Sequence, residues 1–268
     1  RSSFKLTISV LPLFIIYPFM VKTPAIPKII RARVITISFF KKGWETVKAN
    51  LLKIVAAALV LFVIQSLLDA VTSDGERGEM SPEMGILSLV ATIVSLIVGA
   101  AVTSAVIRIV RGAPVELKVL SINASQVLRY VGVAAVMILI VAAFAAPLVG
   151  IAFTLGVTTF VGGSIDSGII AFLVILAIAL GVLIYINLRL MFATYLVVDG
   201  KAGVIAAIKE SWIMTRGQIW TIVKLALLSL VVALLGAIAL IVGLLVAIPV
   251  ITFTYAHYYV ALVDQVKK

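Results

Sequence analysis

The sequence lacks the residue types on which many catalytic and metal sites depend. Its 268 residues include no cysteine and one histidine, His257. The first absence excludes disulfides, thiolate metal ligands and cysteine nucleophiles. The second excludes metal sites built from several histidines of this chain. A Walker-type glycine loop and a Gly-x-Ser-x-Gly motif are absent as well. We therefore expect a protein that is not an enzyme and that needs no metal or cofactor.

Charge is also scarce. Charged residues make up 12% of the chain, about half of the usual share in a soluble domain, whereas hydrophobic residues make up 63%. This composition excludes an ordinary soluble domain and a disordered chain. The formal net charge is +11. In a chain this apolar, such an excess indicates which segments lie on the inner side of a membrane, and we expect no nucleic-acid partner.

Apolar runs predict six membrane spans. A bilayer core of about 30 Å requires roughly 20 apolar residues in a helix, and backbone in lipid has to satisfy its own hydrogen bonds. The last apolar block, 218–263, is too long for one span, so we expect a hairpin that turns within 236–243, where glycine gives the backbone freedom. The expected fold is all-α and polytopic, with three transmembrane hairpins. The first four spans are 51–68, 85–107, 130–153 and 169–188.

A shorter apolar stretch, 6–21, precedes these spans. It contains Pro12 and Pro18 and follows basic residues, a pattern that resembles a signal anchor. It either crosses the membrane as a seventh span or forms a re-entrant or interfacial segment. The expected organisation is therefore an N-terminal apolar segment, 1–21, followed by a six-helix membrane domain, 22–268.

Basic residues gather in every second connection. The segment before the first span and the connections after the second and fourth spans are rich in lysine and arginine, and the chain ends on two lysines. The connections after the first and third spans are acidic. Because retained cytoplasmic loops carry an excess of lysine and arginine, we expect the first basic segment and the C-terminus to be cytoplasmic. The basic residues of the first segment are Lys22, Lys28, Arg31, Arg33, Lys41, Lys42, Lys48 and Lys53.

Each hairpin follows a basic segment that ends in a basic residue and an aromatic residue. This arrangement indicates a weak threefold repeat, although such residues also gather at any membrane interface. In the third segment, Val204, Ile208 and Trp212 lie on one face of a helix, which is typical of a helix in the headgroup layer. The basic segments either bind anionic headgroups specifically or only set the topology. Membrane lipids are the expected partners, together with protein partners if the chain is part of a complex.

The residues between the fourth and fifth spans resemble a known superfamily. The matching features are the run 189–199 (RLMFATYLVVD), the pair Ser211-Trp212 and the pair Arg216-Gly217. They are similar to the glycerophosphodiester phosphodiesterase membrane-domain-like group of bacteria and archaea. The resemblance is close over 185–265, whereas the first half of the chain is similar only in the arrangement of its predicted helices. It implies six helices with amphipathic lead-ins in the cytoplasmic membrane of a prokaryote. In some relatives a soluble phosphodiesterase domain follows, whose acid–base groups one histidine does not supply.

Arg189 is the centre of a candidate polar or lipid-binding site. It lies near the expected cytoplasmic end of the fourth span, where it either snorkels to the headgroups or forms an internal polar site with Asn187 and Tyr185. The alternative for Asn187 is a hydrogen bond to a neighbouring helix. The full set of candidate residues is Tyr185, Asn187, Arg189, Ser211, Trp212, Arg216 and His257.

Two further patterns have both a functional and a structural interpretation. His257, among tyrosines, is either a proton relay or an incidental member of an aromatic belt. A stripe of small polar residues on the second span either packs helices together or lines a polar conduit. The stripe consists of Ser88, Thr92, Ser95, Gly99 and Thr103.

The sequence favours a non-enzymatic membrane protein in membrane organisation or lipid homeostasis, or a membrane subunit of a larger assembly. The alternative is a transporter or permease component for a small or lipidic substrate. That alternative predicts a cavity between the hairpins, reached by Arg189 and Asn187. An intramembrane enzyme would require Arg189, His257 and an acidic residue to converge.

Overall fold

The structure is a computed structural model that describes residues 35–73, 82–162 and 165–266. The predicted N-terminal segment, 1–21, lies outside these ranges. The described residues form helices and no strand. In chain order the elements are α2 (Ile35–Ala49), α3 (Leu51–Ser73), α4 (Pro82–Val110), the 3-10 helix η2 (Leu117–Leu120), α5 (Ala124–Gly162), α6 (Ile165–Leu190), α7 (Ala193–Val198), α8 (Val204–Met214), α9 (Ile219–Ile238) and α10 (Leu240–Val266).

Six of the described helices are long and apolar enough to cross a membrane, which confirms the predicted class. The six stretches are Leu51–Ala70, Gly85–Val110, Ala124–Ile151, Phe172–Val198, Ile219–Ile238 and Gly243–Gln265. They form the three expected hairpins, α3–α4, α5–α6 and α9–α10. Large apolar side chains such as Phe62 and Ile138 are more than half exposed. Such exposure would be a liability in water and is what a lipid-facing helix requires.

The third membrane helix begins six residues before the predicted span. Its first turn is fixed by a cap: the Gln126 side-chain oxygen accepts a hydrogen bond from the Asn123 amide at 3.1 Å, while the Asn123 carbonyl accepts from the Val127 amide. This is one half of a capping box. Hydropathy locates only the apolar part of a helix, so the predicted span did not include this polar first turn.

The last hairpin turns at Ala239, inside the predicted range, but the glycines act there by a different mechanism. The described glycines with positive φ are Gly112, Gly200 and Gly217. Gly236 instead permits close approach, because a Cβ atom at this position would lie 2.7 Å from the Cβ of Ala247. Gly236 and its neighbours therefore serve helix contact rather than a special backbone conformation.

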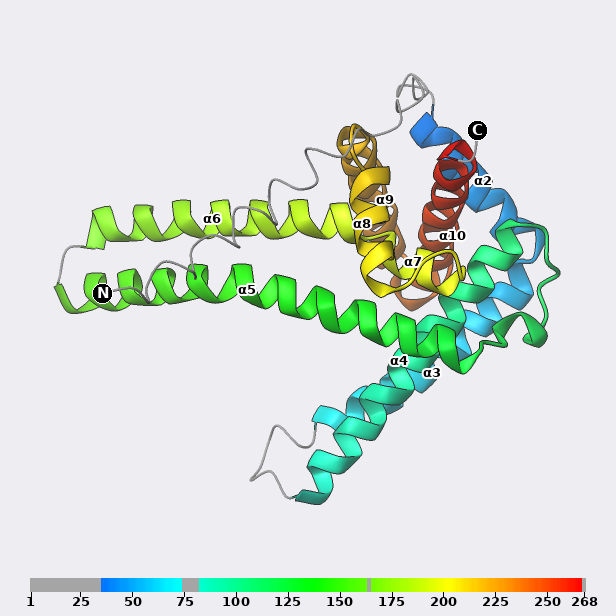
Figure 1. Cartoon of the computed structure of the whole chain (residues 1–268), viewed down its shortest axis with the longest axis horizontal. Coiled ribbons are helices and arrows are strands. Elements are labelled where there is room, and N and C mark those ends of the chain that lie inside the picture. Colours follow the sequence, from blue (N-terminus) through cyan, green and yellow to red (C-terminus); the bar gives the residue numbers. More distant parts are fainter. Residues whose placement is uncertain (1–34, 74–81, 163–164, 267–268) are drawn as a thin grey trace, which may run out of the picture.

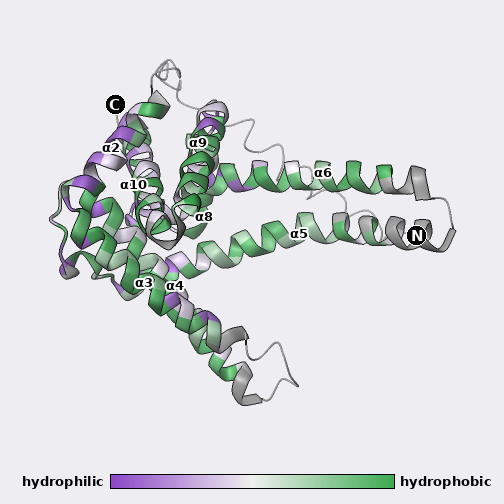
Figure 2. Ribbon diagram, turned by 180° about the vertical axis from the view of Figure 1, so that it is seen from behind, coloured by the Kyte–Doolittle hydropathy of each residue, from purple (hydrophilic) through white to green (hydrophobic). Residues whose placement is uncertain are grey.

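The hairpins diverge from a common junction (Figure 1). The pairs α3–α4 and α5–α6 extend from it at an angle to each other, and α7 and α8 lie where α5 and α6 approach α9 and α10. Hydrophobic residues predominate along α5 and α6, whereas hydrophilic residues gather where the helix ends meet (Figure 2). The ends that meet are those next to the basic connections, so the structure brings the basic segments to one end of the molecule.

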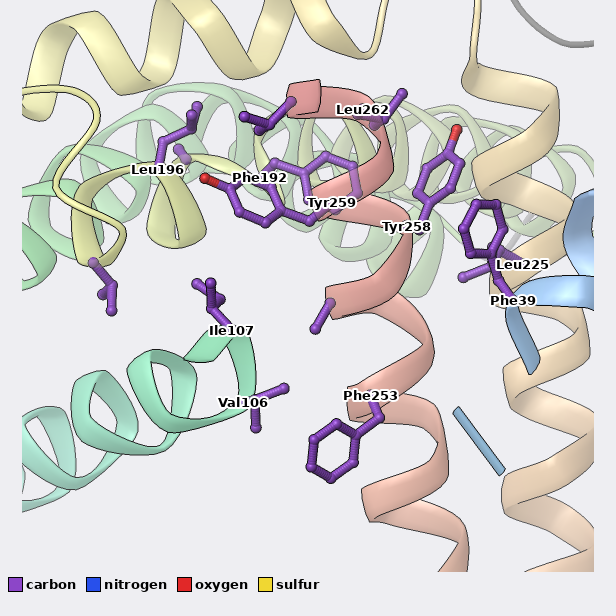
Figure 3. Close-up of a cluster of buried hydrophobic side chains, with 14 of the residues drawn as sticks. Phe39, Val106, Ile107, Phe192, Leu196, Leu225, Phe253, Tyr258, Tyr259 and Leu262 are labelled. Atoms are coloured by element: carbon purple, nitrogen blue, oxygen red, sulfur yellow. The ribbon is translucent and has the colours of Figure 1, made fainter. Parts of the chain in front are cut away.

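The hydrophobic core lies at this junction and is centred on the C-terminal half of α10. Tyr259 and Phe192 are fully buried, and their rings stack with centroids 6.0 Å apart (Figure 3). More than half of the most apolar window of the sixth span is buried (56%), against 6% for the first span. Burial of this kind contributes about 25 cal/mol per Å² of apolar surface. Helix α10 is therefore the central element of the fold: the α3–α4 hairpin packs against it directly, whereas the α5–α6 hairpin joins the junction through α4, α7, α8 and α9.

Helix α2 packs across α10 at Gly43. A Cβ atom at this glycine would lie 2.9 Å from the Val250 carbonyl oxygen and 3.1 Å from the Thr254 amide nitrogen, so the two backbones touch. Beside this crossing the Phe39 ring meets the Tyr258 ring edge-on, with centroids 5.3 Å apart. The described part of the first basic segment thus buries one face on α10 and exposes its lysines on the other.

The three lead-in segments have different structures. The described part of the first contains α2, the second contains the four-residue η2, and the third contains α7 and α8. In α8 the predicted helix is confirmed, and Val204 and Ile208 pack against the core. Its most buried positions are Ala207 and Ser211, so Trp212 lies at the edge of the buried face. The hairpin is thus the unit that recurs in the structure, and the sequence repeat stays a prediction.

Candidate functional site

Arg189 ends α6 between two aromatic rings. Its Nη2 and Nε atoms donate hydrogen bonds to the Tyr185 hydroxyl at 2.9 and 3.1 Å, and Nη1 donates to the Trp212 carbonyl at 3.2 Å. The guanidinium carbon lies 5.3 Å from the centre of the Tyr185 ring and 5.0 Å from that of Trp212. Tyr185 comes from the preceding turn of α6, because residues four apart share a helix face. The cation is held in a fixed orientation by both rings.

Two hydroxyls of the α8 segment lie next to the backbone carbonyl of this arginine. Ser211 Oγ donates to the Arg189 carbonyl at 2.8 Å, and Thr215 Oγ1 lies 3.3 Å from the same oxygen. Both side chains are fully buried. The last carbonyls of a helix have no partner within the helix, so Ser211 completes the end of α6, whereas the Thr215 hydroxyl donates over its shortest distance, 2.8 Å, to the Ser211 carbonyl. Sequence reasoning missed Thr215, although its position four residues after Ser211 on a helix was a usable signal.

The structure therefore brings together Tyr185, Arg189, Ser211 and Trp212 from the predicted set. Asn187 does not join them: it is exposed, and its amide lies 3.4 Å from the carbonyl of Leu183 in its own helix. The reason is helix geometry, because a residue two positions from both Tyr185 and Arg189 points about 200° away from each. In the structure Asn187 is therefore not grouped with Tyr185 and Arg189, and the internal polar site stays a prediction.

Neither Arg216 nor His257 is among the hydrogen-bond or ring contacts of Arg189. Arg216 is exposed on the turn after α8. His257 is on α10, where its Nε2 atom lies 3.0 Å from Thr46 Oγ1 and joins α2 to α10. The partners of His257, of Arg189 and of the one buried acidic side chain in the described ranges, Asp199, are three separate sets. The convergence that an intramembrane enzyme would require is not seen in these contacts.

Arg189 takes part in none of the ion pairs between described residues. Those pairs are Lys41–Glu45, Arg111–Asp199 and Lys201–Asp199. A guanidinium has five N–H groups, and the three hydrogen bonds of Arg189 to protein leave donors for another acceptor. A planar cation with spare donors suits a phosphate or carboxylate group.

Asp199, which the sequence offered as part of the family resemblance and as a loop charge but not as a site residue, forms a second polar cluster. Both of its oxygens accept hydrogen bonds from Arg111, one of them at 2.6 Å from Nη2. Lys201 Nζ lies 2.8 Å from Oδ2, and the Tyr259 hydroxyl donates to the same oxygen at 3.0 Å. The Asp199 side chain is 5% exposed. The cluster joins the end of α4, the end of α7 and the centre of the core.

The electrostatics of Asp199 follow from these donors. Burial alone would raise the pKa of its carboxyl, but the hydrogen bonds and charges of Arg111 and Lys201 outweigh burial and hold that pKa below its usual range. The same hydrogen bond raises the pKa of Arg111. Of the four donor contacts, three fall on Oδ2 and one on Oδ1, so this single carboxylate ties the end of α4 and the loop after α7 to α10.

The small polar stripe of α4 bonds within its own helix. The hydroxyls of Ser88, Thr92 and Thr103 donate to backbone carbonyls three or four residues earlier, at 2.8–2.9 Å. Gly99 faces α5, where a Cβ atom would lie 3.1 Å from the Tyr130 hydroxyl. At Gly99 the structure thus shows close helix packing. The hydroxyls of Ser88, Thr92 and Thr103 donate to carbonyls of α4 itself rather than to the lining of a conduit. Ser95 is the remaining residue of the stripe.

The fold and the site define a multi-pass helical membrane protein whose polar contacts gather at one end. Residues 159–263 match the family model described as the membrane domain of glycerophosphoryl diester phosphodiesterase. The match extends from the end of α5 to α10 and includes Arg189 and Asp199, and it confirms the predicted resemblance for this part, which is less than half of the chain. No curated protein and no solved structure matched the chain.

Proposed function

We propose that this chain is a non-enzymatic membrane protein that holds anionic lipid headgroups at the junction and acts in membrane organisation or lipid homeostasis. The observation that carries the proposal is the guanidinium of Arg189, which lies between Tyr185 and Trp212 with donors to spare and no carboxylate among its described contacts. A lipid phosphate fits such a cation in charge and in hydrogen-bond geometry. The transporter alternative predicts a cavity reached by Arg189 and Asn187, and the apolar groove beside α2 is lined by neither residue.

We further propose that the junction faces the cytoplasm in the cytoplasmic membrane of a prokaryote, with the C-terminus inside. The charge alternation of the connections supports this orientation. So does the packing, because Arg111 before η2 and Lys201 before α8 share one carboxylate and therefore lie on one side of the spans.

The absence of cysteine allows a direct test of this orientation. A single cysteine at the η2 connection (Lys118→Cys) is expected to resist a membrane-impermeant maleimide in intact cells and to react after lysis. A cysteine at the next connection (Asp166→Cys) is expected to react in intact cells. The measurement is the labelled fraction of each variant before and after lysis, and the reverse pattern would show the opposite orientation.

The headgroup site is tested by lipid retention. Arg189→Ala is expected to lower the amount of anionic phospholipid bound to the purified protein by about tenfold, which corresponds to about 1.4 kcal/mol and to the typical loss of a charge-assisted hydrogen bond. Arg189→Lys keeps the charge but not the planar fork, so it should restore binding only in part. Native mass spectrometry with phosphatidylglycerol measures the bound fraction.

Arg129 provides the matched control, because it is an exposed arginine of the same end of the molecule. Arg129→Ala removes the same charge without touching the Tyr185–Trp212 pair. Equal lipid loss in both variants would mean that only net charge attracts lipid, and unchanged binding in Arg189→Ala would refute the site.

A further inference from the structure

An open apolar groove of about 630 Å³ lies between α2 and the α9–α10 hairpin. Small residues near the hairpin turn form its floor, among them Gly236, Gly243 and Ala247. Ile37 and Trp44 of α2 form part of the opposite wall. The volume falls in the range of roughly 300–1,000 Å³ that is typical of small-molecule sites. The groove is separate from the Arg189 site, which lies on α6 and α8.

Close backbone contacts hold both sides of the groove in place. At Gly43 the backbone of α2 already touches the Val250 carbonyl, so α2 cannot move nearer to α10. At Gly236 an added Cβ would lie 2.7 Å from that of Ala247, so α9 and α10 are also at their closest approach. Because the interior of a protein resists compression, the groove between α2 and the α9–α10 turn is preformed.

Lys41 gives this apolar groove a single cation. It is the one ionisable residue among the described residues that line the groove. Its amine lies 3.9 Å from Glu45, and both side chains are largely exposed, so this pair is screened and weak. Lys42 follows directly, with its amine 5.7 Å from the centre of the Phe39 ring. The positive charge of Lys41 is therefore available to a ligand that lies in the groove.

We propose that the groove binds an acyl chain of a membrane phospholipid with an anionic headgroup, and that the Lys41 amine pairs with that headgroup. The apolar floor matches a hydrocarbon chain, and a cation at the rim matches a phosphate-bearing anionic head better than a zwitterionic one. A helix from a second copy would cover the floor but would leave Lys41 without a complementary charge. This site goes beyond the Arg189 proposal and rests on different residues.

Quenching of Trp44 by brominated lipid tests the proposal. The 268-residue protein is placed in nanodiscs of phosphatidylcholine with rising fractions of phosphatidylglycerol brominated in its acyl chains. The Trp44 signal is the difference between the wild type and Trp44→Phe. The control is the double variant Trp44→Phe/Phe62→Trp, which carries its tryptophan at an exposed position of α3. We expect Trp44 to reach half-maximal quenching at a fraction of brominated phosphatidylglycerol at least threefold lower than the control does.

Two variants separate the head and the chain. Lys41→Gln is expected to raise the half-quenching fraction about threefold, whereas Lys48→Gln, which removes another exposed lysine of α2, should leave it unchanged. Val232→Phe narrows the groove and should lower maximal quenching, whereas Leu227→Phe, at an exposed position of α9 outside the groove, should not.

Three results would overturn the proposal. The first is that Trp44 and the tryptophan of the Phe62→Trp control are quenched equally, in proportion to the fraction of brominated lipid. The second is that brominated phosphatidylcholine quenches Trp44 as well as brominated phosphatidylglycerol does. The third is that Trp44 is protected from both lipids while the protein dimerises, which would identify a second copy as the occupant. Because the readout is confined to α2, a failure here leaves the Arg189 measurement unaffected.

Discussion

Gly43→Val is expected to destabilise the protein by about 3 kcal/mol or more, the largest effect expected of any single substitution here. The new side chain would meet backbone atoms, the Val250 carbonyl at 2.9 Å and the Thr254 amide at 3.1 Å. Backbone cannot rotate away as a side chain can, so α2 has to leave α10. Overpacking alone typically costs 1–3 kcal/mol, and separation of α2 would also expose the fully buried Val47.

The measurement is thermal unfolding in detergent, followed by tryptophan emission, because Trp44 adjoins the substituted position. Gly181→Val is the matched control. It makes the same change in a membrane helix at an exposed glycine around which an added Cβ would meet no atom within 4 Å. The control should unfold within about 0.5 kcal/mol of the wild type, as surface substitutions usually do. If Gly43→Val and Gly181→Val unfold at the same temperature, the close contact of α2 with α10 is wrong.

The sequence predicted the spans well because lipid imposes one strong and local rule. Each membrane helix has to present about 20 apolar residues, and this constraint is visible in runs such as 51–68 without knowledge of any partner. The turn of the last hairpin was found for the same reason, since no other place in 218–263 concentrates small residues as 236–243 does. What such a rule leaves open is which helix faces which.

Contacts distant in sequence could not be predicted. The crossing of α2 over α10 pairs Gly43 with Thr254, and neither residue has a periodic or charged signature that names the other. Asp199 is bound by Arg111, 88 positions away, and a count of loop charges reads both only as topology. By contrast, Tyr185 and Arg189 lie one helical turn apart, so their contact follows from the sequence once α6 is a helix.

The resulting architecture explains why the polar contacts gather at one end. Asp199 joins α4 and α7 to Tyr259, and Thr46 joins α2 to His257, so the helix ends beside the basic connections are tied to α10. The opposite ends of α3–α4 and α5–α6 diverge (Figure 1). A rigid junction with lipid-exposed hairpins is suited to holding headgroups at one depth, which is the mechanical basis of the function proposed above.

Asp199→Ala is expected to destabilise this junction by about 3 kcal/mol. Removing one partner of a buried ion pair typically costs 3–5 kcal/mol, because the remaining charge stays desolvated. The lower end applies here, since the Arg111 side chain is 37% exposed and water can compensate it in part. Asp199→Asn keeps the shape and the acceptor for Tyr259 but loses the charge, so it should lie between the alanine variant and the wild type. Thermal unfolding at pH 7 measures both variants.

Acid provides an independent test of the same cluster. Because Arg111 and Lys201 hold the pKa of Asp199 below its usual range, the folded state binds a proton at this carboxyl less readily than the unfolded chain does. The contribution to stability is therefore complete above about pH 4, the ordinary value for aspartate, and is lost as the pH falls through the lower folded-state pKa. Between pH 5 and pH 3 the melting temperature of the wild type should fall more steeply than that of Asp199→Asn. Glu116→Gln, at an exposed acid of the Arg111 connection, should keep the wild-type slope. Equal slopes for the wild type and Asp199→Asn would show that the carboxylate is not tied to its cations in the folded protein.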